Sequence, residues 1–81
     1  MKSSFVKEIR KHIFKNDVHT LYEEYVVDNK TDGLIKHTSE IEEFVRDEGY
    51  VIGLSSFFHI DGNRYGFKLE YRKKGEVSKW N

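Results

Sequence analysis

Apolar residues recur at spacings of three and four near the start of the chain. Phe5, Ile9 and Ile13 fall on one stripe with Val6 beside it, and basic residues occupy most of the remaining positions. This spacing matches the 3.6-residue period of a helix, so the pattern predicts a helix over residues 3–15. Basic residues in its last turn would also suit the negative end of the helix dipole.

The next segment, residues 17–28, is compatible with two structures. Its apolar residues follow the helical series i, i+3, i+4, i+7 and i+8: Val18, Leu21, Tyr22, Tyr25 and Val26. Tyr, Val and Thr favour strands, but a strand would place large apolar groups on both faces. We therefore expect a helix that ends at the polar turn 29–33, and a strand over 18–27 is the alternative.

A short strand and a further helix are predicted in the middle of the chain. Residues 34–37 have the length of a short strand, and a helix is expected over about 40–48. Ser39 and Glu42 have the S-x-x-E spacing of a capping box, and Gly49 occupies the position of the left-handed residue that ends many helices. The buried stripe of this helix would consist of Ile41, Phe44 and Val45.

The clearest element is a C-terminal β-hairpin with strands over about 50–60 and 64–73. Both segments alternate between apolar and polar residues, and Asp61-Gly62 is a strong two-residue hairpin signal. A turn there places one apolar row on a single face: Tyr50, Ile52, Leu54, Phe58, Ile60, Tyr65, Phe67, Leu69 and Tyr71. The opposite, solvent-facing side would carry Phe57, His59, Arg64, Lys68 and Arg72. A register slip of one residue would exchange the two faces of a strand.

These elements predict an α+β fold in which a small antiparallel sheet packs against two or three helices. A strand over 18–27 would instead give four strands and two helices. A chain of 81 residues is expected to form a single domain, residues 1–81. Residues 74–81 are polar apart from Trp80 and are predicted to be a flexible tail.

Composition narrows the protein class. There is no cysteine, and no stretch approaches the roughly 18 apolar residues of a membrane span. Charged residues interrupt the N-terminal apolar positions, which argues against a signal peptide. We therefore expect a cytoplasmic protein. Six Phe, five Tyr and one Trp supply the core that so highly charged a chain needs.

Charge is distributed unevenly although the formal net charge is zero. Residues 1–16 carry a net charge of +4, residues 17–48 carry −7, and residues 49–81 carry +3. The blocks could attract one another within the fold, or they could form faces of opposite sign that recognise partners.

No motif indicates catalysis or a bound cofactor. The segment Gly53-Leu54-Ser55-Ser56-Phe57 lacks the second glycine of a nucleophile elbow, and there is no glycine-rich phosphate loop. His19 and Glu23 are four residues apart, but a zinc site needs three or four ligands. The other histidines, His12, His37 and His59, have no partner that the sequence identifies. We expect no enzyme, no cofactor and no metal.

We expect a small non-enzymatic binding protein that recognises another macromolecule, in first place a protein, through charge-segregated faces. Acidic residues and two aromatic anchors are the candidates for protein binding: Glu23, Glu24, Glu40, Glu42, Glu43, Asp47, Phe57 and Trp80. Small, neutral, cysteine-free domains of this kind are encoded as inhibitors by phages and mobile elements. This comparison rests on size and composition and not on a sequence motif.

The alternative function is nucleic-acid binding through the basic side of the C-terminal hairpin. A basic strand face with an aromatic residue can follow phosphates and stack a base. The candidates are Phe57, His59, Arg64, Lys68, Arg72 and Lys73. The neutral net charge and the acidic segment 40–48 weigh against this alternative.

Overall fold

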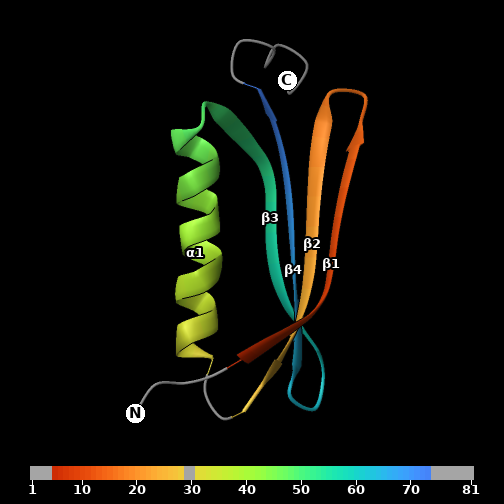
Figure 1. The fold of residues 1–81 in the computed structure, drawn as a ribbon, viewed down its shortest axis with the longest axis vertical. Helices are drawn as coiled ribbons and strands as arrows, with labels where there is room; N and C mark the ends of the chain where they lie inside the picture. The colour runs from red at the N-terminus through yellow and green to blue at the C-terminus, as the bar shows by residue number, and fades with distance from the viewer. Residues whose placement is uncertain (1–4, 29–30, 74–81) are drawn as a thin grey trace.

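A computed structural model describes residues 5–28 and 31–73 of the chain. Within these residues, four antiparallel strands form one sheet and one helix lies against a face of it (Figure 1). In chain order the elements are β1 (Phe5–Lys15), β2 (Val18–Val27), α1 (Asp32–Asp47), β3 (Tyr50–Asp61) and β4 (Arg64–Lys73). The strand order is β1-β2-β4-β3, so β1 and β3 are the edges of the sheet.

The predicted helices over 3–15 and 17–28 are wrong, because these segments form the β1–β2 hairpin. Its two-residue turn places Asn16 and Asp17 at φ values of 54° and 64°, the left-handed conformation that the tightest hairpin turns require. A spacing of four residues is also a multiple of the strand period of two. Ile9 and Ile13 therefore share a face of β1 as readily as they would share a helix stripe.

The strand alternative for residues 18–27 is what the structure contains. Leu21, Glu23, Tyr25 and Val27 are buried on the face that α1 covers in part, hereafter the inner face. Tyr22 and the other intervening residues lie on the opposite, outer face. β2 is a central strand, and it carries large apolar side chains on both faces. The charged Glu23 occupies an inward position, which conceals the apolar–polar alternation of the strand in the sequence.

The fold class needs a corresponding correction, since the described residues contain one helix and not two or three. α1 begins eight residues before the predicted start, so the predicted strand over 34–37 lies within its first two turns. Ser39 and Glu42 lie inside the helix and do not cap it; the N-cap position is Thr31, without a side-chain capping bond. Gly49 follows the helix at φ +92°, as expected for a left-handed terminating residue.

The C-terminal hairpin is confirmed, but its turn is Gly62-Asn63 and its register differs from the prediction. Register shifts at Gly53 and Ile60 add one unpaired residue at each place, and such bulges reverse the face of every residue between them. Phe57 therefore pairs with Phe67 on the inner face, where His59 also lies. The residues Leu54, Ser56 and Phe58 turn to the outer face.

The bulged register gives Phe58 a structural role. It pairs with Gly66, and a Cβ atom at Gly66 would lie 2.5 Å from the Phe58 ring. Glycine lets the ring lie over the backbone of β4, and any side chain at this position would have to displace the ring.

The core lies between α1 and the sheet. It consists of Leu21, Tyr25, Val27, Leu34, Val45, Phe67 and Leu69. α1 contributes the stripe 34–38–41–45 and packs on β3 and β4. No helix in the described part of the chain is long and apolar enough to cross a membrane.

Candidate functional site

One helix cannot cover the inner face of a four-stranded sheet. Four strands spaced about 4.8 Å apart span roughly 19 Å, whereas a helix is about 10 Å wide. α1 packs on β3 and β4, and Figure 1 shows the β1–β2 hairpin on the side of the sheet away from the helix. The inner face of β1 is therefore left exposed beside α1, whereas the inward side chains of β2 are buried.

This uncovered strip forms a groove of about 550 Å³, here called the α1–β1 groove. The helix lines it with His37, Glu40, Ile41, Phe44 and Val45. The sheet lines it with Arg10, His12, Leu21 and Tyr71. Leu21 and Val45 are buried, whereas Phe44 is 63% exposed. The groove thus has an apolar interior and a large exposed aromatic side chain on its helical wall.

The two walls of the groove carry opposite charge. On the β1 side, Lys7 and Arg10 pair with inner-face residues of β2 and so lie on the inner face of the sheet. On the α1 side, Glu40 lines the groove, and Glu43 and Asp47 are exposed on the same helix. A ligand in the groove would meet cations on one flank and carboxylates on the other.

A buried carboxylate supports the basic wall. Glu23 is 1% exposed, and its oxygens lie 3.2 Å from Arg10 Nε, 3.7 Å from Lys7 Nζ and 3.5 Å from His37 Nε2. The Tyr25 hydroxyl donates a hydrogen bond to the same carboxylate. Burial, together with this hydrogen bond, raises the pKa of Tyr25.

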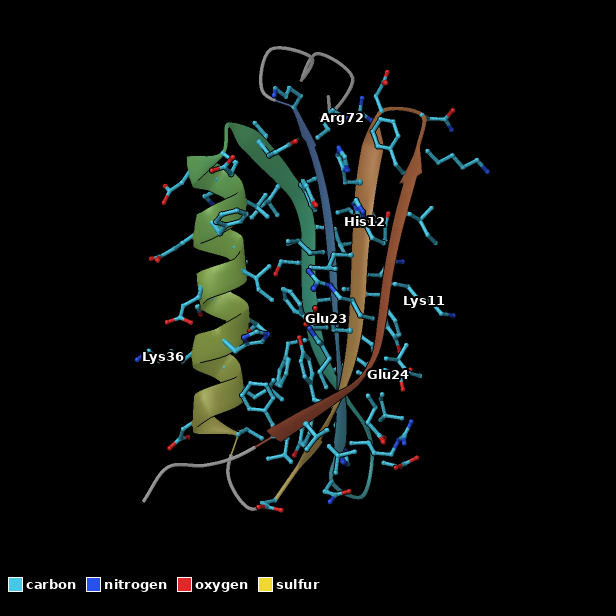
Figure 2. The ribbon with its side chains drawn as sticks, in the orientation of Figure 1. Lys11, His12, Glu23, Glu24, Lys36 and Arg72 are labelled. Carbon is cyan, nitrogen blue, oxygen red and sulfur yellow. The ribbon has the colours of Figure 1, made fainter. Side chains whose placement is uncertain are left out.

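The Glu23 cluster joins three elements, because Glu23 lies on β2 and its ion-pair partners lie on β1 and α1. Figure 2 shows Glu23 on the helix side of the sheet and Glu24 on the opposite side. Since the carboxylate is enclosed by its own partners, it is placed to orient Arg10 and Lys7 rather than to reach a substrate as a general base.

Aromatic rings form a stack along the inner face near the β1–β2 turn. The Nε2 atom of His12 lies 3.1 Å from Nδ1 of His19, and the His19 ring stacks on Tyr71 with centroids 4.9 Å apart. Burial lowers the pKa of His19, and the neighbouring His12 lowers it further. Burial raises the pKa of Tyr71. His12 and Tyr71 from this stack also line the groove.

The structure does not gather the predicted acidic residues into one surface. Glu23 and Glu24 point to opposite faces of the sheet because they are neighbours on a strand. Glu24 accepts hydrogen bonds from the Tyr22 hydroxyl at 2.6 Å and from Arg64 at 2.9 Å. Neither carboxylate is therefore available as part of an open acidic patch.

The remaining acidic candidates lie on α1. Glu42 accepts a hydrogen bond from the Ser55 hydroxyl on β3. Three others are exposed to solvent: Glu40, Glu43 and Asp47. Of the two aromatic candidates, Phe57 stacks on Tyr65 with parallel rings 5.6 Å apart, and Trp80 lies outside the described residues.

The predicted basic row on β4 is largely occupied by intramolecular ion pairs. Arg64 lies 3.1 Å from Glu8 and 2.9 Å from Glu24, and Lys68 lies 3.6 Å from Glu70. Carboxylates thus accompany these cations on the same outer face, so its local charge is close to balanced.

The other nucleic-acid candidates are also dispersed. Arg72 is buried, which corrects the expectation that it faces water. Lys73 lies over the Tyr50 ring, 5.4 Å from its centroid. His59 lies on the inner face and contacts the Gly62 carbonyl oxygen at 2.9 Å. With Phe57 also inward, the predicted aromatic and basic residues do not share one face.

Within the described part of the chain, Glu40 is the one predicted site residue that lines the groove, whereas five other lining residues were not predicted as a site: Arg10, His12, His37, Phe44 and Tyr71. They come from β1, α1 and β4, so no sequence spacing connects them. A signal was present in β1, where four cations are interspersed among the apolar residues, which is typical of a strand exposed on both faces. It could be interpreted only once β1 was known to be a strand.

Across residues 5–28 and 31–73, no three His, Asp or Glu side chains are arranged to hold a metal ion. Comparison of the chain with protein-family models, with curated proteins and with solved structures finds no match.

Proposed function

We propose that this domain is a non-enzymatic protein-binding module that takes an amphipathic helix of a partner protein in the α1–β1 groove. One observation carries the proposal: an uncovered strip of inner sheet face lies beside α1 between walls of opposite charge. Binding of helices in apolar grooves is a recurrent mode of peptide recognition.

The dimensions of the sheet favour a helix as the occupant. The four strands span roughly 19 Å and α1 covers about 10 Å of that width, so about one helix diameter stays open. An incoming helix would complete the second layer over β1 and β2. Its apolar residues at i, i+3 and i+4 would contact Leu21, Ile41 and Phe44 along the groove.

Charge determines which helices fit. Arg10, whose side chain is 61% exposed, would meet an acidic residue on the flank that faces β1. Glu40 would meet a basic residue on the flank that faces α1. Complementary flanks fix the direction of the bound helix and accelerate association. The charge segregation seen in the sequence thus acts across one groove.

Nucleic acid is the less favoured partner class. The cations of β4 are paired with Glu8, Glu24 and Glu70, and Glu40 lies inside the groove itself. Phosphates would meet these carboxylates. We expect the protein not to bind mixed-sequence DNA even at low salt. Binding with a micromolar dissociation constant and a steep salt dependence would instead support the nucleic-acid alternative.

A selection from a library of displayed helical peptides tests the proposal. Enriched peptides should carry an apolar stripe with acidic residues on one flank and basic residues on the other. Their affinity should fall at least tenfold for Arg10→Glu and for Phe44→Ser, since both residues line the groove.

Each variant has a matched control. Lys11→Glu makes the same change of charge on the neighbouring residue of β1, which pairs with Tyr22 on the outer face; Figure 2 shows Lys11 directed away from the helix. Ile35→Ser removes an exposed apolar residue from another part of α1. Equal losses for variants and controls, or no enrichment of helical peptides, would refute the groove as the binding site.

A further inference from the structure

The two edges of the sheet differ in their protection against strand pairing. β1 carries four cations and one carboxylate over Phe5–Lys15: Lys7, Arg10, Lys11, Lys15 and Glu8. β3 carries no Asp, Glu, Lys or Arg from Tyr50 to Ile60, and Asp61 is its one charged residue. Charged side chains on an edge strand oppose the addition of a further strand. By this criterion β1 is protected and β3 is not.

The apolar residues of β3 are exposed along much of the strand. Leu54 is 41% exposed, and Phe58 and Ile60 are each 36% exposed. Among the described strands β3 pairs with β4 alone, so the backbone groups on its other side face away from the sheet. Between the bulges at Gly53 and Ile60, it offers an unbroken stretch of backbone for pairing.

The helix beside β3 extends this surface into a second layer. The Ser55 hydroxyl bonds to Glu42, which identifies the flank of α1 that adjoins β3. Ile35 lies seven residues earlier on the same flank and is 49% exposed. Arg46, four residues after Glu42, is also exposed. This flank of α1 therefore carries Ile35, Glu42 and Arg46, and the charges of the last two balance.

We propose that β3 pairs antiparallel with β3 of a second copy of this chain about a two-fold axis. The product is one continuous sheet with the helices of both copies on the same face. β3, with 12 residues, is roughly 40 Å long, and α1, with 16 residues, is roughly 24 Å long. With each layer about 10 Å deep, their side wall offers about 640 Å² per copy, or about 1,300 Å² for the pair, at the lower end of the standard interface size.

A second copy suits β3 because pairing β3 with itself brings no like charges together from Tyr50 to Ile60. The equivalent pairing of β1 with itself would oppose four cations to four cations. The α1–β1 groove lies at the other edge of the sheet, so the β3 interface is independent of the proposed function and leaves the groove open in both copies.

The mass of the full chain in solution tests the interface. Wild type is expected to sediment as a dimer, and Leu54→Lys combined with Ile60→Lys should halve the mass. The matched control, Ile9→Lys combined with Ile13→Lys, adds the same charge to exposed residues of β1 and should stay dimeric. Circular dichroism establishes that each variant is folded. A monomeric wild type, or dissociation of both variants alike, would overturn the proposal.

Spin-label distances test the geometry directly, because the chain has no cysteine and single introduced cysteines are unambiguous. Labels at Ser56→Cys should lie within about 20 Å of each other across the dimer, whereas labels at Lys11→Cys should be more than about 30 Å apart, since some seven strand spacings separate the outer edges. The reverse pattern would assign the dimer to β1 and overturn the β3 interface.

Discussion

The two halves of this sheet have the same backbone structure but different surroundings. α1 packs on β3 and β4, and the buried core joins Leu34 and Val45 of α1 to inward residues of β4 and β2. β1 extends beyond the helix, and after Phe5 all its residues are exposed. On the inner face between β1 and β2, Glu23 forms a charged cluster with Lys7, Arg10 and His37. The sheet thus contrasts strands that hold the core beside α1 with an edge strand, β1, that is exposed.

This difference separates stability from recognition. Burial of apolar area provides most of the folding free energy in a small domain, and here that area is concentrated where α1 meets β4 and β2. The exposed residues of β1 contribute little to the core, so their side chains can be specialised for binding. Substitutions in the two halves should therefore differ sharply in their effects.

The largest difference is expected between a core leucine and an exposed isoleucine. Leu34→Ala removes a side chain that is 0% exposed and should lower the free energy of unfolding by about 2–5 kcal/mol. Ile13→Ala on β1 should cost less than about 0.5 kcal/mol, because Ile13 is largely exposed. Urea denaturation measures both values. Similar losses would show that β1 belongs to the core.

The adjacent residues Glu23 and Glu24 provide the next comparison. Glu23→Ala leaves the buried Tyr25 hydroxyl without its acceptor and should cost about 1–3 kcal/mol. Glu24→Ala removes a more exposed ion pair with Arg64 and should cost less than about 1 kcal/mol. Chemical denaturation of the two variants checks the order. A larger loss for Glu24→Ala would contradict the assignment of the inner face.

Substitutions in the two hairpin turns should change the stability of the protein in opposite directions. Asp17 has a positive φ, and Asp17→Gly should stabilise the protein by about 0.5–1 kcal/mol, because glycine adopts this conformation without a Cβ clash. Gly62 also has a positive φ, and Gly62→Ala should destabilise by a similar amount. Thermal unfolding reports both shifts. A destabilised Asp17→Gly variant would contradict the hairpin at residues 16–17.

The smallest effect concerns pH. Burial and His12 lower the pKa of His19 from 6.5 in the unfolded chain, so the unfolded state binds the proton more readily. Stability should therefore fall as pH drops through 6.5 toward the lowered native pKa. His19→Gln should reduce this loss, as measured by urea midpoints between pH 8 and pH 5. An unchanged pH dependence would show that His19 titrates alike in both states.

The C-terminal hairpin could be predicted because strict alternation and a turn signal agree over residues 50–73. Its register could not, since the bulges at Gly53 and Ile60 leave no distinct mark in the sequence. The first two strands were misassigned for a physical reason. Their spacing of four fits both a helix and a strand, and the inward Glu23 breaks the apolar alternation of β2.

The groove could not be predicted from sequence patterns. Its residues are distant along the chain, and Arg10, Phe44 and Tyr71 become neighbours only through the strand order. The acidic block was visible, but strand geometry directs Glu23 and Glu24 to opposite faces. The uneven distribution of charge along the chain is visible in the sequence, whereas the topology determines which charges lie on the same face.

Site-specific photo-crosslinking tests the central claim most directly. A photoreactive phenylalanine analogue replaces Phe44 in the groove or, in a second protein, Ile35 elsewhere on α1, and each is irradiated in the cells that produce the chain. The account predicts a discrete protein adduct at position 44, mapped to a helical segment, and none of that mass at position 35. The same adduct at both positions, or nucleic acid as the product at position 44, would contradict it.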